Sequence, residues 1–220
     1  MGELALQIGS GLKWLGIGLS PILLLPFLVL LLTAPLKRIA DGLITGLDGL
    51  STLALFLAKI AAILMVFAQL CVIAGRYVFG WSASWLNELV VYGFAAMFLL
   101  AAASALKFDA HVRVDIFRSA MSVRTRQIIE LVGLYLFLFP VCILILWAVS
   151  ESYSFAESWV RLQGSRESDG LPIYYIFRTF IPVFAILMIL QGLSEALKSA
   201  LIIRGERQPP ETHDLEHGAG

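Results

Sequence analysis

Ionisable side chains within long apolar stretches are the first candidates for chemistry, because a charge in a hydrocarbon environment is costly and rare. Glu88 lies in the first turns of one such stretch. It can contact a polar group of another membrane protein or stay in headgroup water, and both interpretations remain open. Lys59 lies near the start of another stretch, where its long apolar stem predicts that the ammonium reaches the interface. Glu195 and Lys198, three residues apart, have the spacing of an ion pair on one face of a helix.

Uncharged polar side chains in the apolar stretches predict helix packing rather than catalysis. Gln69 and Gln191 can hydrogen-bond across helices, an interaction that contributes about 0.6 kcal/mol on average in membranes. Cys71 and Cys142 are expected to behave as small buried apolar side chains.

No motif in the sequence predicts a metal, cofactor or enzyme site. The three histidines lie outside the apolar stretches and are not clustered with cysteines, so neither a haem ligand nor a metal ligand set is predicted. The sequence contains no G-x-x-x-x-G-K-[ST], G-x-S-x-G or H-E-x-x-H motif. It also lacks the paired repeats and charged, broken helices with which secondary transporters bind solute. The chain is therefore expected neither to be an enzyme nor to move a solute alone.

The elements that must position these residues are membrane-spanning helices. Of the 220 residues, 59% are hydrophobic and 15% are charged, and the mean hydropathy is +0.86, more than a soluble core requires. A helix crosses the hydrocarbon layer with about 20 apolar residues. The sequence therefore predicts an all-α, polytopic membrane protein. Five segments are long enough to cross: 14–36, 52–74, 85–106, 128–150 and 176–197.

The first of these segments is the least regular, because Pro21, Pro26 and Pro35 interrupt it. It can form a tilted or broken fifth span, or a helix along the interface. A signal peptide fits less well, since the apolar region is longer than the usual run of about 7–15 residues and no A-x-A site follows. The predicted organisation is an N-terminal hydrophobic segment with a connector at 1–49, a four-helix membrane domain at 50–200 and a disordered tail at 201–220.

Basic residues predict the orientation, because Lys and Arg near span ends are retained in the cytoplasm. The loop at 107–126 carries five basic and two acidic residues. Placing this loop in the cytoplasm puts 11 basic residues inside and 5 outside, and the C-terminus then faces the cytoplasm. The formal net charge is zero, which gives no reason to expect a nucleic-acid partner.

Three stretches, in this order, resemble the small permease subunit of tripartite ATP-independent periplasmic (TRAP) transporters, the DctQ-like family. The first is RYVFG at 76–80, followed by WLNEL at 85–89. The second is LKFDAHVRVD at 106–115, in which Ala110 stands where the family often has glycine. The third is GLP at 170–172, with QGLS at 191–194. The resemblance covers approximately residues 50–198 and leaves the N-terminal segment outside.

This resemblance implies a scaffold subunit of the bacterial inner membrane that pairs with a large permease subunit and a periplasmic substrate-binding protein. The large subunit would carry the substrate and sodium sites and move the solute by an elevator-type motion. The GLP and QGLS stretches look closer to members associated with keto acids, or with mannitol and chloroaromatic compounds, than to sialic acid systems. The resemblance therefore implies uptake of an organic or keto acid.

The resemblance also implies contacts with the large subunit or with lipid. One group is expected to form a cluster on the outer side that ties two helices or reaches the large subunit: Arg76, Trp85 and Glu88. A second group is expected to order the cytoplasmic turn and contact the large subunit or lipid phosphates, with a solvated amphipathic loop as the alternative: His111, Arg113 and Asp115. Gly170 and Pro172 are expected to set the turn into the last span.

Two other functions compete with the scaffold role. A membrane anchor or cytochrome-type subunit of a respiratory enzyme is the main alternative, although no histidine lies within a span to hold haem. An intramembrane enzyme acting on lipids fits less well, because only His111, Asp109 and Asp115 form a polar constellation.

Overall fold

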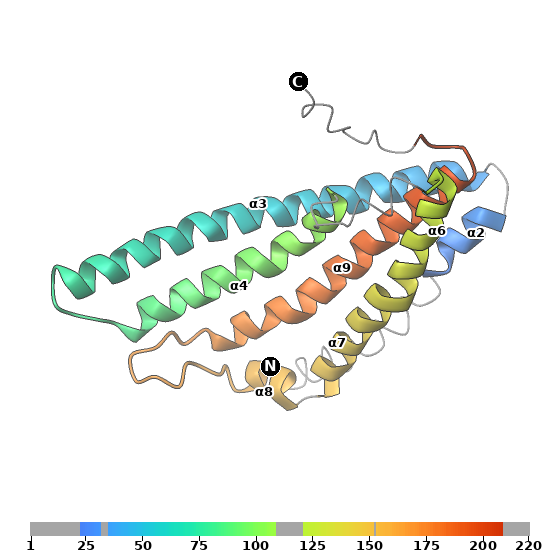
Figure 1. Ribbon diagram of the computed structural model, residues 1–220. Helices are drawn as coiled ribbons and strands as arrows, with labels where there is room; N and C mark the ends of the chain where they lie inside the picture. Colours follow the sequence, from blue (N-terminus) through green and yellow to red (C-terminus); the bar gives the residue numbers. More distant parts are fainter. Residues whose placement is uncertain (1–22, 32–34, 109–120, 152, 209–220) are drawn as a thin grey trace, which may run out of the picture.

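The computed structural model describes residues 23–31, 35–108, 121–151 and 153–208 (Figure 1). This described part is helical and contains no strand, which confirms the all-α prediction. Its elements in chain order are α2 Leu25–Leu31, α3 Pro35–Tyr77, α4 Ser84–Lys107, α6 Val123–Gly133, the π-helix η1 Leu134–Leu138, α7 Phe139–Glu151, α8 Tyr153–Val160 and α9 Tyr174–Ile203.

Within the described residues, four helical segments are long and apolar enough to cross a membrane: Lys37–Tyr77, Ser84–Lys107, Val123–Val149 and Tyr174–Ile203. They contain, to within a residue at one end, the four core segments that hydropathy predicts. The four-span core of a helical membrane protein is therefore confirmed.

Helix α3 is much longer than the predicted second span. Its 43 residues extend for about 64 Å at 1.5 Å per residue, twice the thickness of the hydrocarbon layer. The helix begins at Pro35, and proline suits a first helical position because no intrahelical bond needs its missing N–H. Residues 37–49, expected to be a connector, are helical in the structure.

The N-terminal hydrophobic segment is described only in part. Helix α2 has 7 residues, about 10 Å of helix, and it packs on α9 and α3. Residues 14–22 and 32–34 of the segment lie outside the described residues, so the fifth span stays a prediction.

Helix α9 is the centre of the bundle (Figure 1). It contacts α2, α3, α4, α6, α7 and α8, and its second half is almost entirely buried. Small side chains such as Ser194, Ala196 and Ala200 let neighbouring backbones approach closely, as is common between membrane helices. At Gly192 an added β-carbon would lie 2.9 Å from side-chain atoms of Leu138 and Phe139, so a larger residue would have to displace these side chains.

Two prolines modify the long helices. Pro140, the second residue of α7, cannot donate a hydrogen bond to the carbonyl one turn earlier, and the π-helix η1 ends two residues before it. Pro182 lies inside α9 and is buried. Helices α6, η1 and α7 thus form one continuous span, the third of the four, with a widened π-helical turn in its middle.

Candidate functional site

Glu88 fastens the loop between α8 and α9 to the first turns of α4. Its Oε2 atom accepts the backbone N–H of Leu171 at 2.7 Å, and its Oε1 atom accepts the hydroxyl of Ser165. The hydroxyl of Tyr92, one turn along α4, lies 3.5 Å from Oε2. A carboxylate suits this place because both oxygens accept strong hydrogen bonds. The contacts of Glu88 with Ser165 and Leu171 are called the Glu88 clamp below.

The clamped loop is also bonded to itself. The N–H of Ser165 donates to the carbonyl of Leu171 at 3.0 Å, and the N–H of Glu167 donates to the Ser165 hydroxyl at 3.0 Å. A β-carbon added at Gly170 would overlap the Ser165 side chain and would lie 2.9 Å from Oε1 of Glu88. Besides the turn expected of it, Gly170 therefore gives the carboxylate the room it needs.

Asp169 caps α4 from a distant part of the sequence. The residue before α4 is Ala83, which has no side-chain acceptor for the first N–H groups of the helix. The Oδ2 atom of Asp169 accepts the N–H of Ser84 at 2.9 Å and places a negative charge at the positive end of the helix dipole. This hydrogen bond holds the pKa of the Asp169 carboxyl below its usual value. The loop is thus attached to α4 by one carboxylate from each side.

Arg76 and Trp85 lie at the same end of the bundle as Glu88, at the last turn of α3 and the first turn of α4. Both side chains are exposed, and the Glu88 carboxylate bonds to the loop rather than to Arg76. Contact of these residues with another subunit remains a prediction. His111, Arg113 and Asp115 lie outside the described residues, so their expected roles remain predictions too.

A second polar site joins the first half of α3 to the second half of α9. The Oδ1 atom of Asp48 accepts from the Ser194 hydroxyl at 2.7 Å, the Gln191 amide at 3.1 Å and the Lys198 ammonium at 3.1 Å. Its Oδ2 atom lies 2.9 Å from the Lys198 nitrogen. The set Asp48, Gln191, Ser194, Glu195 and Lys198 is called the Asp48 cluster below.

Glu195 completes the cluster from the α9 side. Its Oε1 atom lies 2.8 Å from the Lys198 nitrogen, which confirms the ion pair predicted from the spacing of three residues. The Gln191 amide donates to the same oxygen at 2.8 Å. Two carboxylates therefore share one ammonium, and Gln191 hydrogen-bonds to both.

Helix α4 is bonded to the same region. The Ser51 hydroxyl donates to the side-chain oxygen of Gln191, and the Ser104 hydroxyl donates to the Ser51 carbonyl at 2.6 Å. The Lys107 ammonium donates to the Asp48 carbonyl at 3.0 Å and to the Thr52 hydroxyl at 2.9 Å. Three helices are thereby held in one register.

Among the described residues, every buried side-chain nitrogen and oxygen has a hydrogen-bond partner. The hydrogen bonds and ion pairs described above bond the Asp48 cluster within its own chain, which suits a structural joint. An open groove of about 530 Å³ lies beside it, lined by Asp41, Ile44, Thr45, Asp48, Gly49, Thr52, Lys107 and Arg207.

Sequence reasoning missed Asp48, because the residue falls in the predicted connector. A signal was present: Asp41, Thr45, Asp48 and Thr52 are spaced at i, i+4, i+7 and i+11, which places them on one face of a helix. Gln191 was recognised as a helix-to-helix donor, and the structure confirms that role.

Several other candidates lie on the outside of the chain. Lys59 and Gln69 are exposed on α3, and Cys71 is exposed there as well, contrary to its expected burial. Cys142 is buried as expected. Cys71 lies on a helix that turns most of its apolar surface outward, and burial inside the chain is not needed where lipid or a partner covers a thiol.

Comparison with known families gives one match. The model described as "Tripartite ATP-independent periplasmic transporters, DctQ component" matches residues 62–201, which include α4, α6, η1, α7, α8 and nearly all of α9. No curated protein and no solved structure gave a match. The match covers more than half of the chain. This chain therefore belongs to the DctQ component family, the small membrane subunits of TRAP transporters, which work with a large permease and a binding protein.

Proposed function

We propose that this chain is the scaffold subunit of a sodium-coupled solute importer, and that it braces the large permease subunit in the bilayer. The observation that carries the proposal is the Asp48 cluster, whose polar side chains bond to one another within a chain of this family. The polar groups of Asp48, Gln191 and Lys198 form a hydrogen bond and an ion pair that join α3 to α9. Polar groups bonded to one another within the chain stabilise a frame, whereas a solute site presents polar groups to its ligand.

The surface of α3 supports a bracing role. Of the most apolar 18-residue stretch of α3, only 11% is buried inside the chain, compared with 39% of the corresponding stretch of α9. Helix α3 therefore has the larger share of apolar surface left for lipid or a partner helix. We assign the large subunit to this surface. The predicted contacts of Arg76, at the outer end of α3, and of Trp85, on the first turn of α4, would extend it.

The charge distribution supports a cytoplasmic C-terminus in the bacterial inner membrane. The end at which α3 and α6 begin and α9 ends carries most of the described basic residues. Lysine and arginine near span ends are retained in the cytoplasm. In this orientation the Glu88 clamp faces the periplasm, where its loop could meet the binding protein, and His111, Arg113 and Asp115 face the cytoplasm.

We propose that the solute is an organic or keto acid, the class that the sequence resemblance favours. The substrate and sodium sites would lie on the large subunit. The solute can be identified separately by screening organic and keto acids for thermal stabilisation of the binding protein encoded beside this chain.

Reconstitution tests the proposal. Liposomes with the neighbouring large permease, with or without this chain, receive the loaded binding protein and an inward gradient of sodium or of choline. Uptake is expected only with both membrane subunits and sodium. Equal uptake without this chain, or with choline, would overturn the proposed role.

Co-purification tests the contact residues. The large subunit is expected to be recovered in smaller amounts with Glu88→Ala or Asp115→Ala than with the wild-type chain. Undiminished recovery and transport with both variants would remove those two residues from the interface.

A further inference from the structure

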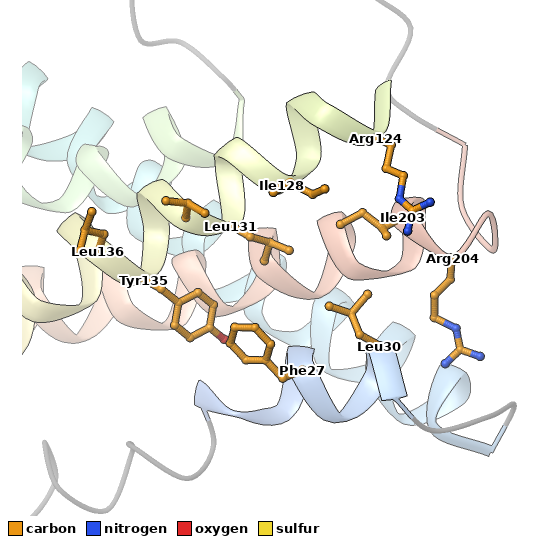
Figure 2. Close-up of a pocket in the computed structure, with 10 residues that line it drawn as sticks. Phe27, Leu30, Arg124, Ile128, Leu131, Tyr135, Leu136, Ile203 and Arg204 are labelled. Carbon is orange, nitrogen blue, oxygen red and sulfur yellow. The ribbon is translucent and has the colours of Figure 1, made fainter. Parts of the chain in front are cut away.

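An open groove of about 740 Å³ lies between α2, the α6–η1 segment and the last turn of α9. Figure 2 shows Arg124 and Arg204 at one end of this groove and Phe27 and Tyr135 towards the other. Apart from the two arginines, the lining residues are aliphatic or aromatic. The groove is thus charged at one end and apolar along the rest.

The apolar part of the groove is exposed, and its wall has a fixed orientation. Ile128 is 46% exposed and Leu136 is 62% exposed, so the wall is open towards the surroundings of the bundle. Tyr135 donates its hydroxyl to the Leu23 carbonyl and packs its ring against Phe27 at 4.8 Å, which leaves an apolar surface of fixed orientation. From Arg124 to Leu136 the wall is about 18 Å long, close to the roughly 15 Å of one hydrocarbon leaflet.

The charged end suits an anion. Arg204 donates to the Val29 carbonyl and pairs with Glu206 at 3.0 Å, so its guanidinium is held in place. Arg124 is exposed at the start of α6. Glu206 offsets part of the Arg204 charge, but basic residues exceed acidic ones at this end of the described chain: Lys37, Arg38, Arg124, Arg126, Arg204 and Arg207 against Asp41, Glu130 and Glu206.

We propose that this groove binds one phospholipid with a net negative headgroup. The phosphate lies between Arg124 and Arg204, because guanidinium groups match phosphate oxygens in geometry and are weakly hydrated. One acyl chain lies along Ile128 and Leu136. The wall includes the π-helix η1, and π-helical turns are frequent at functional sites. This inference does not depend on the proposed transport function.

Lipid binding to the purified full chain tests the headgroup. Native mass spectrometry is performed in detergent with phosphatidylglycerol, with phosphatidylcholine of the same acyl chains, and with inorganic phosphate. Phosphatidylglycerol is expected to bind one to one and more tightly than the other two. Arg124→Gln is expected to weaken it roughly tenfold, the size of a charge-assisted hydrogen bond. Arg38→Gln, a matched charge loss at the same end but outside the groove, is expected to leave affinity unchanged.

Photo-crosslinking in native membranes tests the occupant. With benzoylphenylalanine at position 128, the expected adduct has the mass of one phospholipid and decreases when Arg124→Gln is added. Capture of residues 1–22 of this chain, or of another polypeptide, would overturn the proposal. Equal binding of both lipids, or equal loss in Arg124→Gln and Arg38→Gln, would overturn it as well.

Discussion

The Oδ2 atom of Asp48 on α3 lies 2.9 Å from the Nζ atom of Lys198 on α9, and only 20% and 15% of the two side chains are exposed. Lys198 also neutralises Glu195 on its own helix at 2.8 Å. The ammonium therefore links two helices and separates two carboxylates. We expect its removal to destabilise the chain more than removal of either acid.

Lys198→Met is expected to destabilise the chain by about 2–4 kcal/mol, because Asp48 and Glu195 then face each other without a cation. The measurement is the free energy of unfolding in mixed micelles. Asp41→Asn, an exposed acid two turns earlier on α3, is the control and should change the value by less than about 0.5 kcal/mol. Asp48→Asn added to Lys198→Met should restore part of the loss. If Lys198→Met has the same free energy of unfolding as the wild type, the Asp48 cluster does not stabilise the chain in the way proposed.

Glu88→Ala is expected to release the loop of the Glu88 clamp, since the Leu171 amide loses its acceptor at 2.7 Å. Hydrogen exchange at Leu171 should accelerate roughly tenfold, the equivalent of about 1.4 kcal/mol. Glu167→Gln changes a charge in the same loop whose side chain takes no part in the clamp, and it should leave exchange as in the wild type. Similar exchange in both variants would show that the loop is held by other contacts.

The Asp169 cap makes the start of α4 sensitive to acid. Its pKa is lowered by the hydrogen bond from Ser84, so the carboxylate stabilises the folded chain above the unfolded-state pKa. That contribution is lost as the pH falls through the lowered folded-state pKa. The protection factor of the Ser84 amide is expected to decrease in this acidic range in the wild type. In Asp169→Asn it should be lower at neutral pH and insensitive to acid, and a parallel decrease in both proteins would contradict the cap.

Gly93→Ala is expected to push α4 away from α3, because the new β-carbon would lie 2.9 Å from the β-carbon of Met65, close to the backbone. Overpacking of this kind costs about 1–3 kcal/mol. Gly46→Ala, with nothing within 4 Å of the added carbon, should instead stabilise α3 by up to about 1 kcal/mol. The melting temperature is therefore expected to fall in Gly93→Ala and to rise in Gly46→Ala. Two shifts of the same sign would refute the close contact.

Topology reporters test the orientation. A reporter at Gly220 is expected to give a cytoplasmic signal, and one at Gly2 a periplasmic signal if 14–36 crosses the membrane. A cytoplasmic signal at Gly2 excludes the five-span arrangement. A periplasmic signal at Gly220 reverses the assignment of the Glu88 clamp to the outside.

Hydropathy predicted the four spans because apolar length is a local property of the sequence. The Glu195–Lys198 pair was predicted for the same reason, since its spacing is local. The partners of Glu88 were not, because Ser165 and Leu171 lie 77 and 83 residues away in a polar loop. Asp48 was missed because its polar, glycine-containing surroundings resemble a connector. Packing on α9 and hydrogen bonds to α4 help to explain why that region is helical.

The central position of α9 has a consequence for biogenesis. Helices α3 and α4 pack on each other and can associate as soon as both are inserted. Helices α6 and α7 pack on α9, which is the last helix of the described chain to leave the ribosome. At about 5–20 residues per second, roughly 6–25 s separate the synthesis of Tyr77 from that of Ile203. During this interval Asp48 has no ammonium partner from Lys198, so the joint between α3 and α9 forms only at the end of synthesis.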